Sequence, residues 1–187
     1  MGPTKEAKRK GYTINLFVDA KTGKYIEEFA TSNFVMLTKP DEEGKRSYIT
    51  PKSNSILPSI TNRSLSELAA LHFGWKVVRR RVRWDELVDG EFDEIAACGT
   101  AVVITPVGEI DRQVPVSPSN ITQEEEQVLE DISTMWTSNR VEPELKMEKV
   151  VCNSEFEGFK ALYTTYRQIQ YGQLPDKFEW MYPPQGI

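Results

Sequence analysis

Two short stretches of the chain combine small residues and hydroxyl groups in a way that suits anion binding. Gly99-Thr100-Ala101 follows a segment of small residues and precedes a β-branched run that ends at Pro106. This pattern predicts a tight turn between buried segments, with backbone N–H groups free to face an anion. Thr61 stands near the start of a predicted helix, where its hydroxyl and the neighbouring N–H groups would point out of the helix. Small turns and threonine caps are also common for structural reasons, so these stretches alone do not identify a site.

The elements that would position these residues are strands interspersed with a few helices. Apolar patterns predict strands at residues 13–19, 32–38, 46–50, 76–83 and 149–152, and helices at residues 64–73, 122–136 and 154–172. Ser64 and Glu67 have the spacing of a capping box, although Thr61, one turn earlier, is an alternative helix start. Ser154 and Glu157 show the same spacing in the last helix. The irregular alternation of strands and helices indicates an α/β (α+β) layer or barrel-like domain.

The composition excludes several classes of protein. The chain has 187 residues and a net charge of −5, which favours one globular domain and argues against a nucleic-acid partner. It has no apolar run long enough for a membrane span and no signal core, so we expect an intracellular, cytoplasmic protein. Cys98 and Cys152 are expected to be reduced thiols. With His72 as the sole histidine, a zinc site or a Ser-His-Asp triad lacks its residues, and no metal site is expected.

Several of these segments, taken in order, carry a resemblance to a known family. They are residues 28–33 (EFATSN), 56–61 (ILPSIT), 97–101 (ACGTA), 166–172 (YRQIQYG) and Glu179-Trp180. The series resembles the branched-chain amino-acid aminotransferases, which are pyridoxal 5′-phosphate (PLP) enzymes of fold type IV. The resemblance implies the large, C-terminal domain of that fold, a barrel-like mixed sheet flanked by helices, over residues 1–187. It also implies an expanded acidic, helical insertion at about residues 111–145 and the absence of the small N-terminal domain.

The resemblance assigns roles in cofactor binding to four residues. A glutamate at the place of Glu28 pairs with the pyridine nitrogen in the family, which keeps the ring protonated and able to accept electrons. Backbone N–H groups that match Ile60 and Thr61, at a helix start, would hold the phosphate. The hydroxyl groups of Thr61 and Thr100 would add donors to it. Each of these residues also has an ordinary structural interpretation, as an exposed carboxylate, a helix cap or a turn residue.

The chain resembles the family at the substrate-binding positions and departs from it at the catalytic lysine. Thr31 and the backbone of Ala101 match positions that help to seat the substrate carboxylate. The family's Schiff-base lysine lies several tens of residues upstream of the glutamate, which places it before Met1, so no catalytic residue is assigned. The lysines nearest to that gap, Lys5, Lys8 and Lys10, do not follow the family's motif. Two further departures are a serine for glycine at position 59 and an asparagine for arginine at position 62, either of which is expected to reshape the phosphate site.

Three hypotheses about function follow. The first, which we favour, is the large domain of a branched-chain-type aminotransferase; its family reaction transfers an amino group between amino acids and 2-oxoglutarate. We expect this chain to be inactive alone. The second is a non-catalytic protein that pairs with a full-length relative. The third is a PLP-independent enzyme of specialised metabolism, in which groups such as Glu28 and Tyr25 act as acid and base. Because part of the family's large domain is normally covered, we expect a homo-oligomer, or a hetero-oligomer with a full-length relative.

Overall fold

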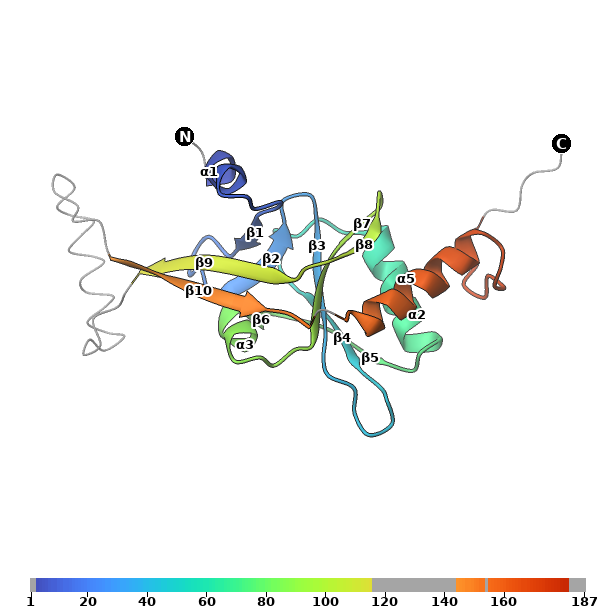
Figure 1. The fold of residues 1–187 in the computed structure, drawn as a ribbon. Coiled ribbons are helices and arrows are strands. Elements are labelled where there is room, and N and C mark those ends of the chain that lie inside the picture. The colour runs from blue at the N-terminus through green and yellow to red at the C-terminus, as the bar shows by residue number, and fades with distance from the viewer. Residues whose placement is uncertain (1–2, 116–143, 154, 182–187) are drawn as a thin grey trace. The chain divides into compact units, whose positions relative to one another are not determined.

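The computed structural model describes residues 3–115, 144–153 and 155–181 (Figure 1). The chain divides into two compact units, one formed by Met1–Glu109 with Val151–Ile187 and the other by Ile110–Val150. In the second unit, β9 (Glu109–Pro115) pairs with β10 (Leu145–Val151), so the predicted strand at 149–152 begins earlier than expected. The predicted helix at 122–136 lies outside the described residues. Most of the predicted insertion at 111–145 also lies outside them.

A mixed sheet forms the first unit. Its strands are β1 (Leu16–Val18), β2 (Tyr25–Phe29), β3 (Ser32–Leu37), β4 (Ser47–Pro51), β5 (Lys76–Arg80), β6 (Val82–Arg83), β7 (Glu94–Gly99) and β8 (Val103–Pro106). The strand order is β1-β2-β3-β4-β5, with β6 paired to β2 and β7 paired to both β3 and β8. The β4–β5 pair is parallel, and the other recorded pairs are antiparallel. Over the described residues, the recorded pairs do not close the sheet into a barrel.

Strand β3 is the centre of this sheet. It pairs with β2, β4 and β7, and each residue from Asn33 to Leu37 is buried. Because side chains on both faces of a central strand are covered, such a strand is a continuous apolar run rather than an alternating one. The sequence Phe-Val-Met-Leu therefore explains the position of β3, and the predicted strand at 32–38 is confirmed. Asn33 is the polar residue at the start of this buried run.

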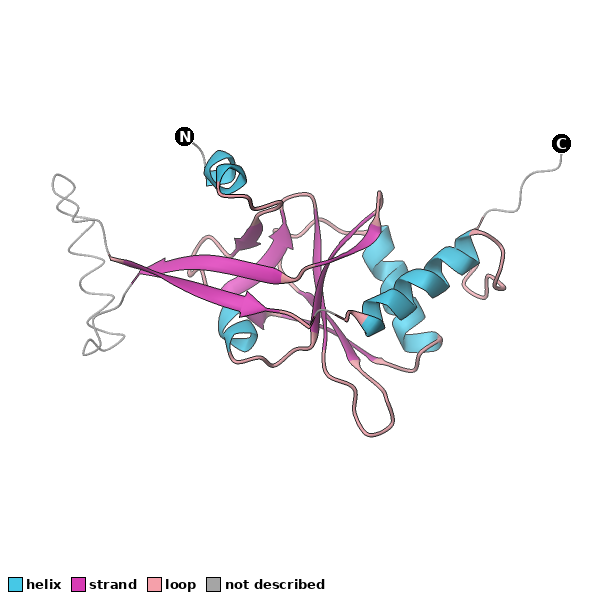
Figure 2. Ribbon diagram, viewed as in Figure 1, coloured by secondary structure: helices cyan, strands magenta, loops and turns pink. Residues whose placement is uncertain are grey.

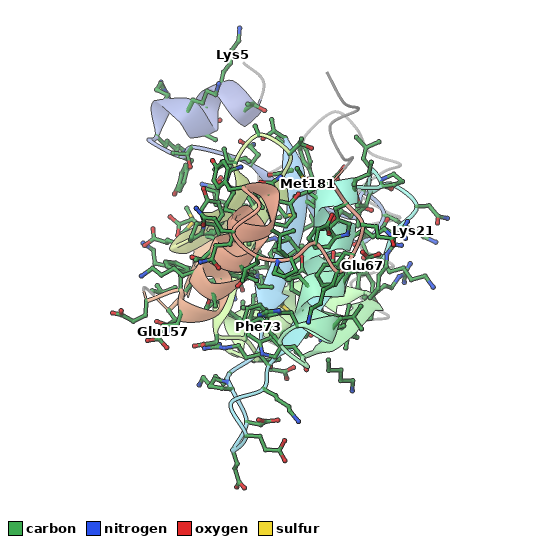
Figure 3. The ribbon with its side chains drawn as sticks, turned by 90° about the vertical axis from the view of Figure 1, so that its right-hand side faces the viewer. Lys5, Lys21, Glu67, Phe73, Glu157 and Met181 are labelled. Atoms are coloured by element: carbon green, nitrogen blue, oxygen red, sulfur yellow. The ribbon has the colours of Figure 1, made fainter. Side chains whose placement is uncertain are left out.

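Two long helices pack against the sheet and against each other: α2 (Ile60–Leu71) and α5 (Glu157–Gln170). Figure 2 shows both helices together at one side of the strands, while the short helices α1 (Pro3–Arg9) and α3 (Trp84–Val88) lie elsewhere. Apolar residues of α2 and α5 pack against apolar residues of β3, β4, β7 and β8 to form the core. The core includes Leu65, Leu68, Phe159 and Leu162 from the helices and Val35, Ala96 and Ile104 from the strands. Figure 3, a view from that side, labels Glu67 on α2, Phe73 in the turn just after that helix, and Glu157 at the start of α5.

Helix α2 begins earlier than either predicted start. Its N-cap is Ser59, which has an extended backbone (φ −121°, ψ 122°) and accepts a hydrogen bond from the Asn62 N–H at 3.1 Å. Ser64 is buried inside the helix, so the predicted capping box with Glu67 does not start it. The Thr61 start is also wrong, because Thr61 lies in the first turn. An N-cap needs a non-helical backbone, and of these residues Ser59 has one.

Helix α5 begins without a side-chain cap from its own sequence. Its N-cap residue, Phe156, has a left-handed backbone (φ 49°), and Glu157 is the first helical residue. A capping box needs its glutamate at the third helical position, so Glu157 does not form the predicted one. Ser154 lies outside the described residues. Instead, the carboxylate of Glu94 on β7 accepts the N–H groups of Gly158 and Phe159 at 2.8 and 2.9 Å. A residue distant in the sequence thus supplies the anion that a helix N-terminus favours.

Candidate functional site

The first turn of α2 presents backbone donors. Ser59 occupies two of the N–H groups at the helix start: its hydroxyl accepts from Asn62, and its carbonyl accepts from Arg63 at 3.1 Å. Within the described residues, no partner is recorded for the N–H groups of Ile60 and Thr61. These two groups lie at the positive end of the helix dipole, where a phosphate or carboxylate binds well. The side chain of Ile60 is 85% exposed, so only its backbone is a candidate for anion binding.

Two threonine hydroxyls from distant parts of the chain meet at this helix start. Oγ1 of Thr61 lies 3.5 Å from Oγ1 of Thr100, although the two residues are 39 positions apart in the sequence. Thr61 is buried, whereas Thr100 lies exposed in the turn between β7 and β8. The tertiary structure therefore gathers two hydroxyls and two backbone N–H groups from α2 and this turn. Such a set of neutral donors can hold an anion with several oxygen atoms.

Glu28 lies on β2, opposite Asn33 of β3. Nδ2 of Asn33 donates to Oε2 of Glu28 at 3.1 Å and to the carbonyl of Leu57 at 3.2 Å. Leu57 precedes Ile60 by three residues, so Asn33 connects the carboxylate to the segment that leads into α2. These two hydrogen bonds link the Glu28 carboxylate to the segment that ends in the N–H donors of α2. The role of Asn33 was not predicted, although a polar residue at the start of a buried apolar strand could have indicated it.

The two predicted substrate-binding residues lie in neighbouring turns. Thr31 is exposed in the turn between β2 and β3, and Ala101 is exposed in the turn that contains Thr100. Gly99 brings these turns together, because a Cβ atom built on it would lie 3.4 Å from Cβ of Ser32 and 3.8 Å from the Thr31 carbonyl oxygen. A small residue is thus suited to position 99 at the point where the two turns meet.

The chemistry of the site defines a class of ligand. Donors suited to an anion lie at the start of α2. The carboxylate of Glu28, a group that pairs with cations, is linked by Asn33 to Leu57 in the segment that leads into this helix. Together these groups suit a small ligand that has an anionic group and a cationic or protonated group.

Residues 3–110 match the family described as amino-transferase class IV, and the chain belongs to this family. It is similar to the branched-chain-amino-acid aminotransferase of Helicobacter pylori, with 41% identity over 124 residues, covering 64% of this chain and 34% of that protein. It is also similar to the aminotransferase poxL of Penicillium oxalicum, with 39% identity over 107 residues, covering 57% of this chain and 28% of that protein. The chain spans about a third or less of the length of these curated relatives.

A solved structure supports the fold. The branched-chain amino acid aminotransferase of Thermobaculum terrenum, in its PLP form, is similar with a TM-score of 0.56 and 24% identity. The similarity covers 91% of this chain and 41% of that one. The predicted mixed sheet with flanking helices, as in part of a fold-type IV enzyme, is confirmed. In the part of the chain that the structure describes, no helix has the length and apolar character that a membrane crossing requires.

Proposed function

We propose that this chain forms the cofactor-binding part of a PLP-dependent aminotransferase of the branched-chain type. The observation that carries the proposal is the contact of Thr61 with Thr100 at the start of α2, together with the connection of Glu28 to the same segment through Asn33. When bound, PLP supplies a ring that withdraws electrons from the α-carbon of an amino acid. The relatives from Helicobacter pylori and Penicillium oxalicum are both named as aminotransferases, which is consistent with this assignment.

The residues present fit this cofactor at both ends. The N–H groups of Ile60 and Thr61, with the hydroxyls of Thr61 and Thr100, would bind the phosphate. Glu28 would hold a proton on the ring nitrogen, because a nearby carboxylate stabilises the protonated form of a basic ring. Asn33 donates to one oxygen of that carboxylate and so orients it.

The substrates in this proposal are branched-chain or related amino acids and 2-oxo acids. Thr31 and the backbone of Ala101 would bind the substrate carboxylate from their two adjacent turns. We propose further that residues 1–187 bind the cofactor without catalysing transamination, since Lys5, Lys8 and Lys10 do not follow the motif of the family's catalytic lysine. Acid–base transfer at the α-carbon would then need a group other than these three lysines.

Exposed aliphatic side chains near the start of α2 support an oligomer. Leu57 and Ile60 precede and begin the helix, and Val102 follows Thr100 and Ala101 in the turn between β7 and β8; all three are exposed. Exposed apolar residues that gather on one part of a surface are candidates for contact with another chain. We propose that a second copy of this chain, or a longer relative, covers them. Light scattering that shows only monomer at high protein concentration would contradict this proposal.

Direct binding tests the proposed cofactor site. Titration calorimetry with PLP should show binding to the wild-type chain. A Thr61→Val/Thr100→Val double variant should bind at least about tenfold more weakly, because two hydroxyl donors to a charged group are lost. Thr105→Val, at an exposed strand residue five positions after Thr100, is the matched control and should bind as the wild type does. Equal affinity in the wild type, double variant and control would refute the phosphate site.

The proposed inactivity needs its own assay. Leucine and 2-oxoglutarate should give no turnover with the chain and PLP. Borohydride treatment followed by peptide mass spectrometry should find no lysine that carries the cofactor at stoichiometric level. Turnover together with one specifically modified lysine would overturn the proposal that these residues do not transaminate.

A further inference from the structure

The side chain of Asn62, in the first turn of α2, is directed towards strand β4. Its Oδ1 accepts the hydroxyl of Tyr48 at 2.8 Å, and its Nδ2 donates to Oγ1 of Thr50 at 2.9 Å. Tyr48 and Thr50 are both buried. Both the oxygen and the nitrogen of the amide therefore make a hydrogen bond to β4, which holds the side chain on the core side of the helix.

The hydrogen bonds continue into the sheet and into the helix. Oγ1 of Thr50 donates to the carbonyl of Phe34 on the central strand β3 at 3.4 Å. Oγ of Ser66 donates to the carbonyl of Asn62 at 2.8 Å. Burial raises the pKa of Tyr48 well above its usual value, so the phenol remains protonated and serves as a donor. A buried tyrosine hydroxyl needs such a partner, and Asn62 supplies it.

Asn62 is held at two places at once. Ser59 accepts its backbone N–H, and β4 holds its side chain. Only Ile60 and Thr61 lie between Ser59 and Asn62 in the sequence, and their N–H groups are the proposed phosphate donors. Fixing both ends of so short a segment restricts the directions of the two N–H groups and places the Thr61 hydroxyl against Thr100.

We propose that Asn62, through Tyr48 and Thr50, is a positioning residue that sets the geometry of the phosphate site at the start of α2. This inference rests on the proposed function, because it concerns the affinity of that same site for a phosphorylated ligand. The side chain acts through the backbone of its neighbours and does not touch the ligand. Precise placement of donors matters, since a supporting residue that lets them shift by about 1 Å weakens a site markedly.

The test compares a phosphorylated ligand with its dephosphorylated form. Pyridoxine 5′-phosphate and pyridoxine are suitable, because neither has an aldehyde that surface lysines could capture. The full chain should bind the phosphorylated form more tightly. Asn62→Leu removes both side-chain hydrogen bonds, and Tyr48→Phe removes one and keeps the asparagine. Each should weaken binding of pyridoxine 5′-phosphate, by about tenfold for Asn62→Leu, the equivalent of about 1.4 kcal/mol. Binding of pyridoxine itself should not change.

A control separates positioning from a general loss of stability. Gly158→Ala disturbs α5 at its contact with Leu37 and does not touch the Asn62 hydrogen bonds, so it should lower stability while leaving the affinity for both ligands unchanged. A wild-type chain with no preference for the phosphorylated form would refute the proposed function. A wild-type preference that persists unchanged in Asn62→Leu and Tyr48→Phe would refute the positioning role alone. Equal weakening of both ligands would also refute it, because a structural defect would explain that result. If Asn62→Leu does not fold, Tyr48→Phe alone decides the question.

Discussion

Replacing Glu94 with glutamine tests whether a buried carboxylate on β7 stabilises the start of helix α5. Glu94 has no solvent exposure, and its two oxygens accept the N–H groups of Gly158 and Phe159. Nη1 of Arg46 lies 3.4 Å from Oε1 of Glu94 and 2.5 Å from Oδ2 of Asp93. The carboxylate therefore serves the helix N-terminus and an ion pair at the same time.

The size of the effect follows from these contacts. Glutamine keeps one acceptor oxygen, and its NH₂ group would face the second helix N–H. One hydrogen bond to a charged group is worth about 1.5–3 kcal/mol, and a buried N–H without a partner costs about 1–3 kcal/mol. Arg46 keeps Asp93, so no buried cation is left uncompensated. We expect Glu94→Gln to lower the free energy of unfolding by about 3 kcal/mol, which corresponds to a fall in Tm of roughly 6–12 °C for a chain of this size.

Urea denaturation followed by circular dichroism measures the free energy of unfolding, and a thermal scan gives the Tm. Glu157→Gln is the matched control, because Glu157 is an exposed carboxylate in the first turn of the same helix. That control should stay within about 0.5 kcal/mol of the wild type, as surface substitutions usually do. A Glu94→Gln variant as stable as the Glu157→Gln control would refute the claim that Glu94 stabilises the start of α5.

Three further outcomes are expected. Gly158→Ala should destabilise the fold by about 1–3 kcal/mol in urea, because the new methyl group would lie 2.6 Å from Cδ1 of Leu37; a neutral result would show that Leu37 moves freely. Burial alone would raise the pKa of Asp19, but hydrogen bonds from Tyr25, Thr22 and Lys24 lower it to about 2. The stabilising contribution of this carboxylate is therefore present above pH ~4 and is lost as the pH falls from about 4 to 2. The urea midpoint should fall more over this range in the wild type than in Asp19→Asn. Burial raises the pKa of Cys98 and Cys152 to about 12, so iodoacetamide at pH 8 should label both far more slowly in the native chain than in urea. Equal labelling rates would contradict their burial.

The order of motifs was enough to name the candidate site residues. Glu28, Thr61 and Thr100 are recognisable because they stand within segments that occur in a set order along the chain, and the family assignment is confirmed over residues 3–110. Their roles in binding stay predictions. What the motifs did not predict is how Glu28 is connected to the helix start, since the Asn33 side chain spans to Leu57 across 24 positions of sequence.

For the helices α2 and α5, the sequence predicted that they exist, and the tertiary structure decided where they begin. The apolar spacing of α2 and α5 predicted both helices, because a helix that packs on a sheet must have one apolar face. Their first residues were predicted wrongly, because a serine with a glutamate three residues later does not by itself start a helix: Ser64 lies inside α2, and Glu157 is the first residue of α5. Which residue caps the helix depends on backbone conformation and on partners elsewhere in the fold.

The amino-acid sequence by itself determined the class of fold, the presence of a strand at residues 32–38, and the family. These depend on apolar periodicity and on the order of short motifs, both of which are local properties of the chain. The tertiary structure alone decided that Glu94 stabilises the start of α5, that Asn62 binds Tyr48 and Thr50 of β4, and that the hydroxyls of Thr61 and Thr100 meet. Each of these is a polar contact between residues distant in sequence. The packing of helices against the sheet brings such partners together, and no short stretch of sequence encodes the pairing.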